Sequence, residues 1–213
     1  GMQSFFFPKN LSYFTEYNLF ETTPKNIKKW KKTYDKMLKQ IVFYNGGNRR
    51  LLLKNPHNTG RVKILKELYP NAKFIFIHRN PYEVFNSTQH LYRTTIKSQF
   101  LQDFGEQEIN ERVLLGYEKT MRAYLEQRHE IGKENLIEIS YNELSEQPMN
   151  CMENIYKRLK MGEFTEVKTN FQTYLDNKKN YKKNAFNPVP SDLKNQINKR
   201  WAFAFEAWNY EMN

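Results

Sequence analysis

The feature that most constrains the fold is the stretch from Lys73 to Tyr92, which reads KFIFIHRNPYEVFNSTQHLY. It opens with a continuous apolar run, a pattern typical of a strand that is covered on both faces. Asn80 then suits the N-cap of a helix, Pro81 its first position and Glu83 the third position of a capping box. A strand, a tight turn and a helix in this order predict an α/β fold with a parallel sheet.

Two further short apolar runs also predict strands. Together with the central run they give three strands, at 51–54, 73–78 and 135–140, among five or six helices. A covered parallel sheet usually has more strands, and we expect the absent one near its middle. The expected architecture is a small, mostly parallel sheet flanked by helices in three layers, as one domain over residues 1–213 with an irregular arm at 1–22.

Polar residues gather where two of these strands end. Arg79 follows the central strand, and Ser87 lies eight residues later, about two turns into the helix. Ligands of open α/β sheets bind at such strand ends, where a guanidinium, a hydroxyl and a helix N-terminus all favour a phosphate. Lys54 and His57 follow the strand at 51–54, so we expect them beside Arg79. From the residues alone, the alternative is that all four side chains are solvated surface groups.

Charge and composition narrow the classes of partner. The 34 Lys and Arg residues against 23 Asp and Glu give a net charge of +11, which favours a nucleotide, an acidic glycan, a nucleic acid or an anionic membrane surface. The lysines are spread over several predicted helices without a basic and aromatic platform, so no specific nucleic-acid interface is expected. The histidines show no ligand spacing, so no metal is expected. The single cysteine, Cys151, excludes an internal disulfide and fits a cytoplasmic protein. No apolar run reaches the ~20 residues of a transmembrane helix.

The segment Arg79-Asn80-Pro81, with Ser87 eight residues after the arginine, resembles the 3′-phosphate-binding segment of the sulfotransferases that use 3′-phosphoadenosine 5′-phosphosulfate (PAPS). The flanking segments LLLKNP, PNAKFIFIHRNP and LIEISYNEL are similar to the bacterial and carbohydrate-type branch of that family, and the similarity extends from about Trp30 to the C-terminus. The resemblance implies a P-loop-transferase-like fold in which Arg79 and Ser87 bind the 3′-phosphate. It also implies PAPS as nucleotide co-substrate and a hydroxyl or amine acceptor, with carbohydrates as one acceptor class.

The resemblance implies roles for two further segments. A basic C-terminal loop can close over the nucleotide in this family, which makes Lys182 and Lys183 candidates, against the alternative of a solvated lysine run. The segment after Leu53 matches the family's Lys-Ser-Pro or Lys-Asn-Pro loop. This match makes His57 a candidate base and Lys54 a candidate catalytic residue. Some relatives carry the histidine one position later, where this chain has Asn58.

One element of the family pattern does not occur in this sequence. Family members begin with a strand and a loop resembling Pro-Lys/Arg-Ser-Gly-Thr-Thr, which cradles the 5′-phosphosulfate. The 213 residues contain no such segment. The interpretations left open are a fragment of a longer enzyme, a shortened member, a gap filled by another segment or subunit, and a non-catalytic binding module.

Overall fold

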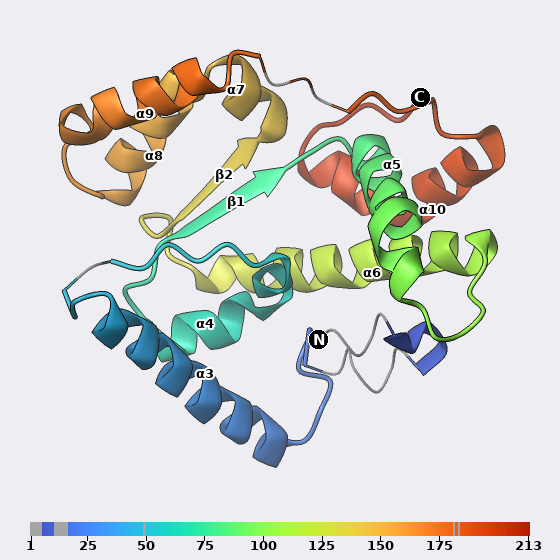
Figure 1. The fold of residues 1–213 in the computed structure, drawn as a ribbon, viewed down its shortest axis with the longest axis horizontal. Coiled ribbons are helices and arrows are strands. Elements are labelled where there is room, and N and C mark those ends of the chain that lie inside the picture. The colour runs from blue at the N-terminus through green and yellow to red at the C-terminus, as the bar shows by residue number, and fades with distance from the viewer. Residues whose placement is uncertain (1–5, 11–16, 49, 181, 183) are drawn as a thin grey trace.

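The structure is a computed structural model that describes residues 6–10, 17–48, 50–180, 182 and 184–213. Figure 1 shows a central pair of strands between the helices of residues 141–177 on one side and, on the other, a second group built around one long helix. The α-helices are α3 (Pro24–Tyr44), α4 (Val62–Leu68), α5 (Pro81–Leu91), α6 (Glu106–Gln127), α7 (Tyr141–Glu146), α8 (Pro148–Leu159), α9 (Thr165–Asn177) and α10 (Ser191–Ala207). The short turns are η1 (Pro8–Asn10), η2 (Pro56–Arg61), η3 (Tyr92–Ile96), η4 (Lys97–Gln99) and η5 (Arg128–Glu130).

The sheet consists of two parallel strands, β1 (Phe74–His78) and β2 (Leu136–Ser140). Phe74 pairs with Leu136 at one end, and His78 pairs with Ser140 at the carboxyl end. These strands confirm the predictions at 73–78 and 135–140, and the parallel pairing between helical layers confirms the α/β fold class. Among the described helices, none combines the length and the hydropathy needed to cross a bilayer.

One face of the sheet packs on α6 and α10 through aromatic residues. The Phe76 ring stacks on Tyr124 of α6 with centroids 4.0 Å apart, and it also lies 5.3 Å from the ring of Trp208. Glu138 of β2 points to the same face, where it accepts hydrogen bonds from the Tyr124 hydroxyl (2.6 Å) and from Arg128 (3.0 Å). The sheet and the long helix are therefore joined by both ring packing and a partly buried ion pair.

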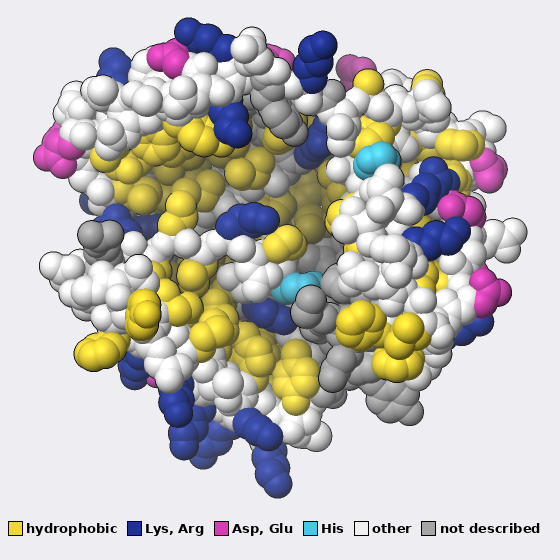
Figure 2. Space-filling view, in the orientation of Figure 1, with side chains coloured by type: hydrophobic (Ala, Val, Ile, Leu, Met, Phe, Trp, Pro, Cys, Tyr) yellow, Lys and Arg dark blue, Asp and Glu magenta, His cyan; other side chains and the backbone are white. Residues whose placement is uncertain are grey.

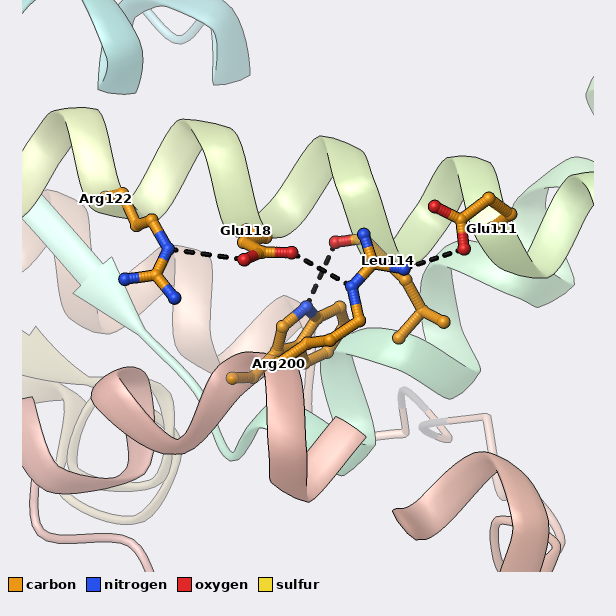
Figure 3. A network of polar contacts seen from close by, with 6 residues as sticks. Glu111, Leu114, Glu118, Arg122 and Arg200 are labelled. Carbon is orange, nitrogen blue, oxygen red and sulfur yellow. Dashed lines mark hydrogen bonds and ion pairs between the residues drawn. The ribbon is translucent and has the colours of Figure 1, made fainter. Parts of the chain in front are cut away.

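A second core holds α10 against α6, and it centres on the fully buried Trp201. The Trp201 indole N–H donates to the Leu114 carbonyl oxygen at 3.0 Å. Around it Arg200 binds Glu111 at 2.7 Å and Glu118 at 2.9 Å, as Figure 3 shows. This arrangement fixes the layer on which β1 and α5 rest.

In the part of the chain that the structure describes, the opposite face of the sheet is covered only over β2. Ile137 and Ile139 are buried in a cluster with side chains of α8. Ile75 and Ile77 pair with them in register and point to the same face, yet both are exposed, Ile77 at 47%. The prediction of a central strand covered on both faces was therefore wrong for β1. The reason is that α8 follows β2 along the chain and packs on β2 rather than on β1.

The predicted strand at 51–54 was also wrong. This segment is irregular, and Leu52 at its centre is 86% exposed. A strand requires a neighbouring strand for its backbone hydrogen bonds, and among the described residues the sheet contains β1 and β2 alone. An apolar run without a pairing partner therefore remained a loop. The edge of β1 away from β2 has no paired strand in the described part of the chain.

Candidate anion-binding site

The carboxyl edge of the sheet brings two helix N-termini side by side. β1 leads through Arg79 and Asn80 into α5, and β2 leads directly into α7. The Asn80 side chain accepts a hydrogen bond from the Tyr82 backbone N–H at 2.9 Å, which confirms Asn80 as the N-cap. The strand register places Arg79, the residue after His78, next to Tyr141, the residue after Ser140. This position is where the sequence predicts an anion site.

Two side chains fix the Arg79 guanidinium. Its Nε donates to Glu83 Oε2 at 2.6 Å, and its central carbon lies 4.5 Å from the centroid of the Tyr141 ring. Glu83 was predicted to complete a capping box, but its carboxylate binds Arg79 instead. No other described residue bonds to the guanidinium, so its two Nη groups remain available as donors for a planar, bidentate acceptor such as a phosphate.

Ser87 lies on the same side of α5 as Glu83, the residue that binds Arg79. Glu83 and Ser87 are four residues apart in one helix, which makes them neighbours on its surface. The Ser87 side chain is half-buried, and its hydroxyl has no hydrogen-bond partner among the described residues. Arg79, Glu83 and Ser87 therefore form one row at the N-terminal half of α5. We call this row, together with Tyr141, the arginine site.

The C-terminal loop returns to the same helix. The Asn86 side chain donates to the Asn187 carbonyl oxygen at 3.1 Å, and the His90 ring lies 5.4 Å from the ring of Phe186. Because Asn86 is the neighbour of Ser87 in the chain, this contact brings the basic segment that precedes Asn187 toward Ser87. Lys182 is exposed in that segment, and Lys183 lies outside the described residues.

Lys54 lies in the irregular segment before η2, and His57 lies in η2, which packs on α6 and α4. Both side chains are exposed, and no hydrogen bond or ion pair joins either of them to Arg79 or Ser87 among the described residues. Partial desolvation by the surrounding protein, followed by the charge of Arg61, lowers the pKa of His57. The neighbouring Asn58 carries a buried side-chain oxygen that has no hydrogen-bond partner in the described part of the structure.

A hydrophobic groove of about 630 Å³ opens between α8 and α9, and its wall reaches α7. Figure 2 shows hydrophobic side chains lining a hollow on this side of the molecule. Leu144, which lies one turn after Tyr141 in α7, belongs to this wall, so the groove begins close to the arginine site. The remaining lining residues are Pro148, Met149, Met152, Tyr156, Val167, Asn170, Phe171, Tyr174 and Leu175.

Sequence reasoning missed two members of the arginine site. Tyr141 was noted only as part of the LIEISYNEL match, and Glu83 only as a cap. The spacing of four between Arg79 and Glu83 was a usable signal for an ion pair, because it matches the helical repeat. The Tyr141 contact depends on the register of β1 against β2, which the sequence does not contain.

Comparisons with known proteins identify the family of this chain. Residues 12–166 match the model of the sulfotransferase family. Two curated relatives, both named omega-hydroxy-beta-dihydromenaquinone-9 sulfotransferase Stf3, come from Mycobacterium bovis and Mycobacterium tuberculosis. Each is 27% identical over 206 residues, which is 96% of this chain and 52% of the relative. The chain thus spans about half the length of these curated relatives.

A solved structure supports the fold. The crystal structure of sulfotransferase STF9 from Mycobacterium avium superposes with a TM-score of 0.64 at 22% sequence identity, over 75% of this chain and 42% of the other. The family match covers well over half of the sequence and includes the strand, turn and helix that carry Arg79 and Ser87. The chain belongs to the sulfotransferase family.

Proposed function

We propose that this chain binds the 3′-phosphate of PAPS at the arginine site, as part of a sulfotransferase that transfers a sulfuryl group to a hydroxyl or amine acceptor. The observation that carries the proposal is the position of Arg79 at the carboxyl end of β1, with its guanidinium held by Tyr141 and Glu83. Family membership and the row formed with Ser87 support it.

The expected binding mode follows from the available donors. The Nη groups of Arg79 would donate to two phosphate oxygens, and the Ser87 hydroxyl would donate to a third. Glu83 carries a negative charge beside the bound phosphate, so binding requires the carboxylate to move away or to share the guanidinium. The contact of Asn187 with Asn86 supports Lys182 and Lys183 as further candidates that close over the nucleotide.

Catalytic turnover needs more than the site for the 3′-phosphate of PAPS. The acceptor hydroxyl must lie in line with the sulfur, and a base must take its proton as the bond to sulfur forms. His57 is the candidate base, because its lowered pKa favours the neutral imidazole that accepts a proton. Lys54 is the candidate for stabilising developing negative charge. The leaving phosphate needs preorganised donors as well, and the family loop that supplies them does not occur in this sequence. A non-catalytic nucleotide-binding module is therefore the second candidate function.

The groove between α8 and α9 favours an acceptor with a hydrocarbon part over a carbohydrate. Its wall is almost entirely apolar, and it starts one helical turn from Tyr141. The relatives are named for a hydroxylated dihydromenaquinone, an acceptor of this kind. Phe171→Glu should weaken binding of the fluorescent fatty acid cis-parinaric acid, whereas Leu101→Glu, at an exposed leucine outside the groove, should not. Equal binding by both variants would exclude the groove.

Calorimetric titration of 3′-phosphoadenosine 5′-phosphate (PAP) tests the arginine site. Arg79→Ala should weaken PAP binding by about 10-fold to 100-fold, since a hydrogen bond to a charged group contributes about 1.5–3 kcal/mol. Arg122→Ala is a matched control, because Arg122 also binds a glutamate one turn away and lies over a ring, that of Phe203 at 4.2 Å. An equal loss in both variants would refute a site at Arg79.

A further inference from the structure

The outer face of α3 carries a continuous basic stripe. Successive residues of an α-helix turn by about 100°, and on this basis six lysines fall within an arc of about 100°. All six are exposed. They are Lys25, Lys28, Lys29, Lys32, Lys36 and Lys39. In the described structure only Lys39 among them forms an ion pair, with Asp35 at 2.7 Å. The helix holds seven lysines and one aspartate, a net charge of +6 within a chain of +11.

The opposite face of α3 explains why the helix keeps this orientation. Trp30 stacks on Tyr34 with ring centroids 4.6 Å apart, and the Phe20 ring lies edge-on to Trp30 at 4.8 Å. Leu38 is buried, and Lys31 reaches Glu67 of α4 at 2.6 Å. Trp30 and Tyr34 therefore face the body, and the basic stripe is directed to solvent. Figure 2 shows basic side chains projecting from the edge of the molecule where Figure 1 places α3.

The basic stripe ends in two exposed aromatic residues. Phe43 is 84% exposed and Tyr44 is 92% exposed, and Phe43 falls within the arc of the six lysines. Gly46 and Gly47 follow in left-handed conformations, at φ of +89° and +82°, and end the helix sharply. Leu52, in the segment after this turn, is also largely exposed. Phe43 and Tyr44 are adjacent and largely exposed, and contiguous exposed apolar side chains of this kind mark interaction surfaces.

A shallow depression joins the stripe to the aromatic end. It measures about 660 Å³, and its lining combines the last lysines of the stripe with Phe43 and Tyr44. Asp35 also lines it, but its carboxylate is bound by Lys39 and by the Tyr69 hydroxyl. The depression is therefore positively charged at one side and apolar at the other, which is the polarity of an anionic lipid with its acyl chain.

We propose that the basic stripe and the Phe43–Tyr44 end of α3 bind the surface of an anionic lipid bilayer. Lysines near such a surface each contribute about 1 kcal/mol of attraction. Aromatic residues insert at the headgroup level, where tyrosine keeps its hydroxyl in water. A single-stranded nucleic acid would instead need aromatic rings interleaved with the cations for base stacking, and the rings between these lysines face the body. The inference does not rest on nucleotide binding at the arginine site.

Vesicle sedimentation tests the proposal. Wild-type protein should bind vesicles of equimolar phosphatidylglycerol and phosphatidylcholine but not vesicles of phosphatidylcholine alone, and added salt should weaken the binding. A triple variant, Lys29→Gln with Lys32→Gln and Lys36→Gln, should bind about 100-fold more weakly, at about fivefold per lysine. The control variant Lys157→Gln with Lys168→Gln and Lys199→Gln loses the same charge from other exposed helix positions and should keep most of the binding.

Three further measurements keep the outcome unambiguous. The emission of Phe43→Trp should shift to the blue when anionic vesicles are added, and by more than the wild-type emission of Trp30, Trp201 and Trp208, because the ring at position 43 enters the interface; equal shifts in the variant and the wild type would overturn the insertion. If the two triple variants lose vesicle binding equally, binding depends on the net charge of the protein and not on the stripe, and the proposal is overturned. If the wild type binds a DNA oligonucleotide but not vesicles, and the first triple variant loses this DNA binding, the partner of the stripe is a nucleic acid and the bilayer proposal is overturned. PAP binding should be unchanged in every variant. A loss of PAP binding would therefore report on the arginine site and would be distinguished from a loss of vesicle binding.

Discussion

Replacing Glu83 with glutamine should tighten PAP binding. The Glu83 carboxylate accepts from Arg79 Nε at 2.6 Å, so it occupies part of the guanidinium to which we assign the 3′-phosphate. A phosphate on the Nη groups would lie about 5 Å from this carboxylate, and two unit charges at that distance repel by about 1 kcal/mol in water and about 3 kcal/mol at an effective dielectric constant of about 20.

The expected gain is smaller than the full repulsion. Both side chains are partly exposed, so the lower end of the range applies, and the ion pair itself contributes about 0–1 kcal/mol to ordering Arg79. The net effect of Glu83→Gln is therefore about 1 kcal/mol, or about fivefold tighter PAP binding.

Isothermal titration of PAP and of AMP at one ionic strength measures this effect. AMP lacks the 3′-phosphate and should respond little. Glu106→Gln is the matched control, since Glu106 binds Arg93 at 2.7 Å away from the site. Weaker PAP binding in Glu83→Gln would mean that Glu83 positions Arg79 rather than competing with the phosphate. An equal gain for AMP would refute a dedicated 3′-phosphate contact.

Three further predictions follow from the same structure. Tyr141→Leu should weaken PAP binding by about twofold to fivefold in the same titration, because a cation–π contact at an exposed site is worth about 0.5–1 kcal/mol, whereas Tyr141→Phe should keep the affinity. Ile139→Ala should lower the free energy of unfolding by about 2–4 kcal/mol, because Ile139 is buried. Ile77 pairs with Ile139 but is exposed, so Ile77→Ala should lower it by less than about 1 kcal/mol. Equal losses in denaturant melts would contradict the open face of β1. Burial lowers the pKa of His78 below 6.5, against smaller raising effects of Glu138 and Glu143. The unfolded chain therefore binds more protons than the folded chain once the pH falls through about 6.5, and stability is lost from that pH downward. His78→Gln should reduce this pH dependence, and an unchanged slope would exclude His78 as a source.

Local sequence signals predicted the elements that depend on neighbouring residues. Asn80 caps α5, as expected from its position before Pro81. Thr23 stands before Pro24 in the same way and caps α3 by accepting from the Asn26 N–H at 3.3 Å. The two observed strands also lie where their apolar runs predicted them. In these elements the hydrogen bonds and the apolar spacing are set within a few residues of each other.

Features that depend on distant residues could not be predicted in the same way. Leu51 to Leu53 read as a strand, but a strand also needs a partner edge, and none of the described segments pairs there. The arginine site was predicted by resemblance at Arg79 and Ser87. The orientation of Arg79 depends on Tyr141, which lies 62 residues further along the chain and reaches it only through the parallel register.

The most direct test of the central claim is the difference in affinity between PAP and AMP, measured by calorimetry at fixed moderate salt on the wild-type chain and on Arg79→Ala. The account predicts that the wild type prefers PAP by at least about 10-fold, since the 3′-phosphate adds charge-assisted hydrogen bonds. It also predicts that Arg79→Ala removes most of this preference while AMP binding changes little. Equal binding of the two nucleotides by the wild type, unaffected by the substitution, would contradict a 3′-phosphate site at Arg79 and would leave the fold without this function.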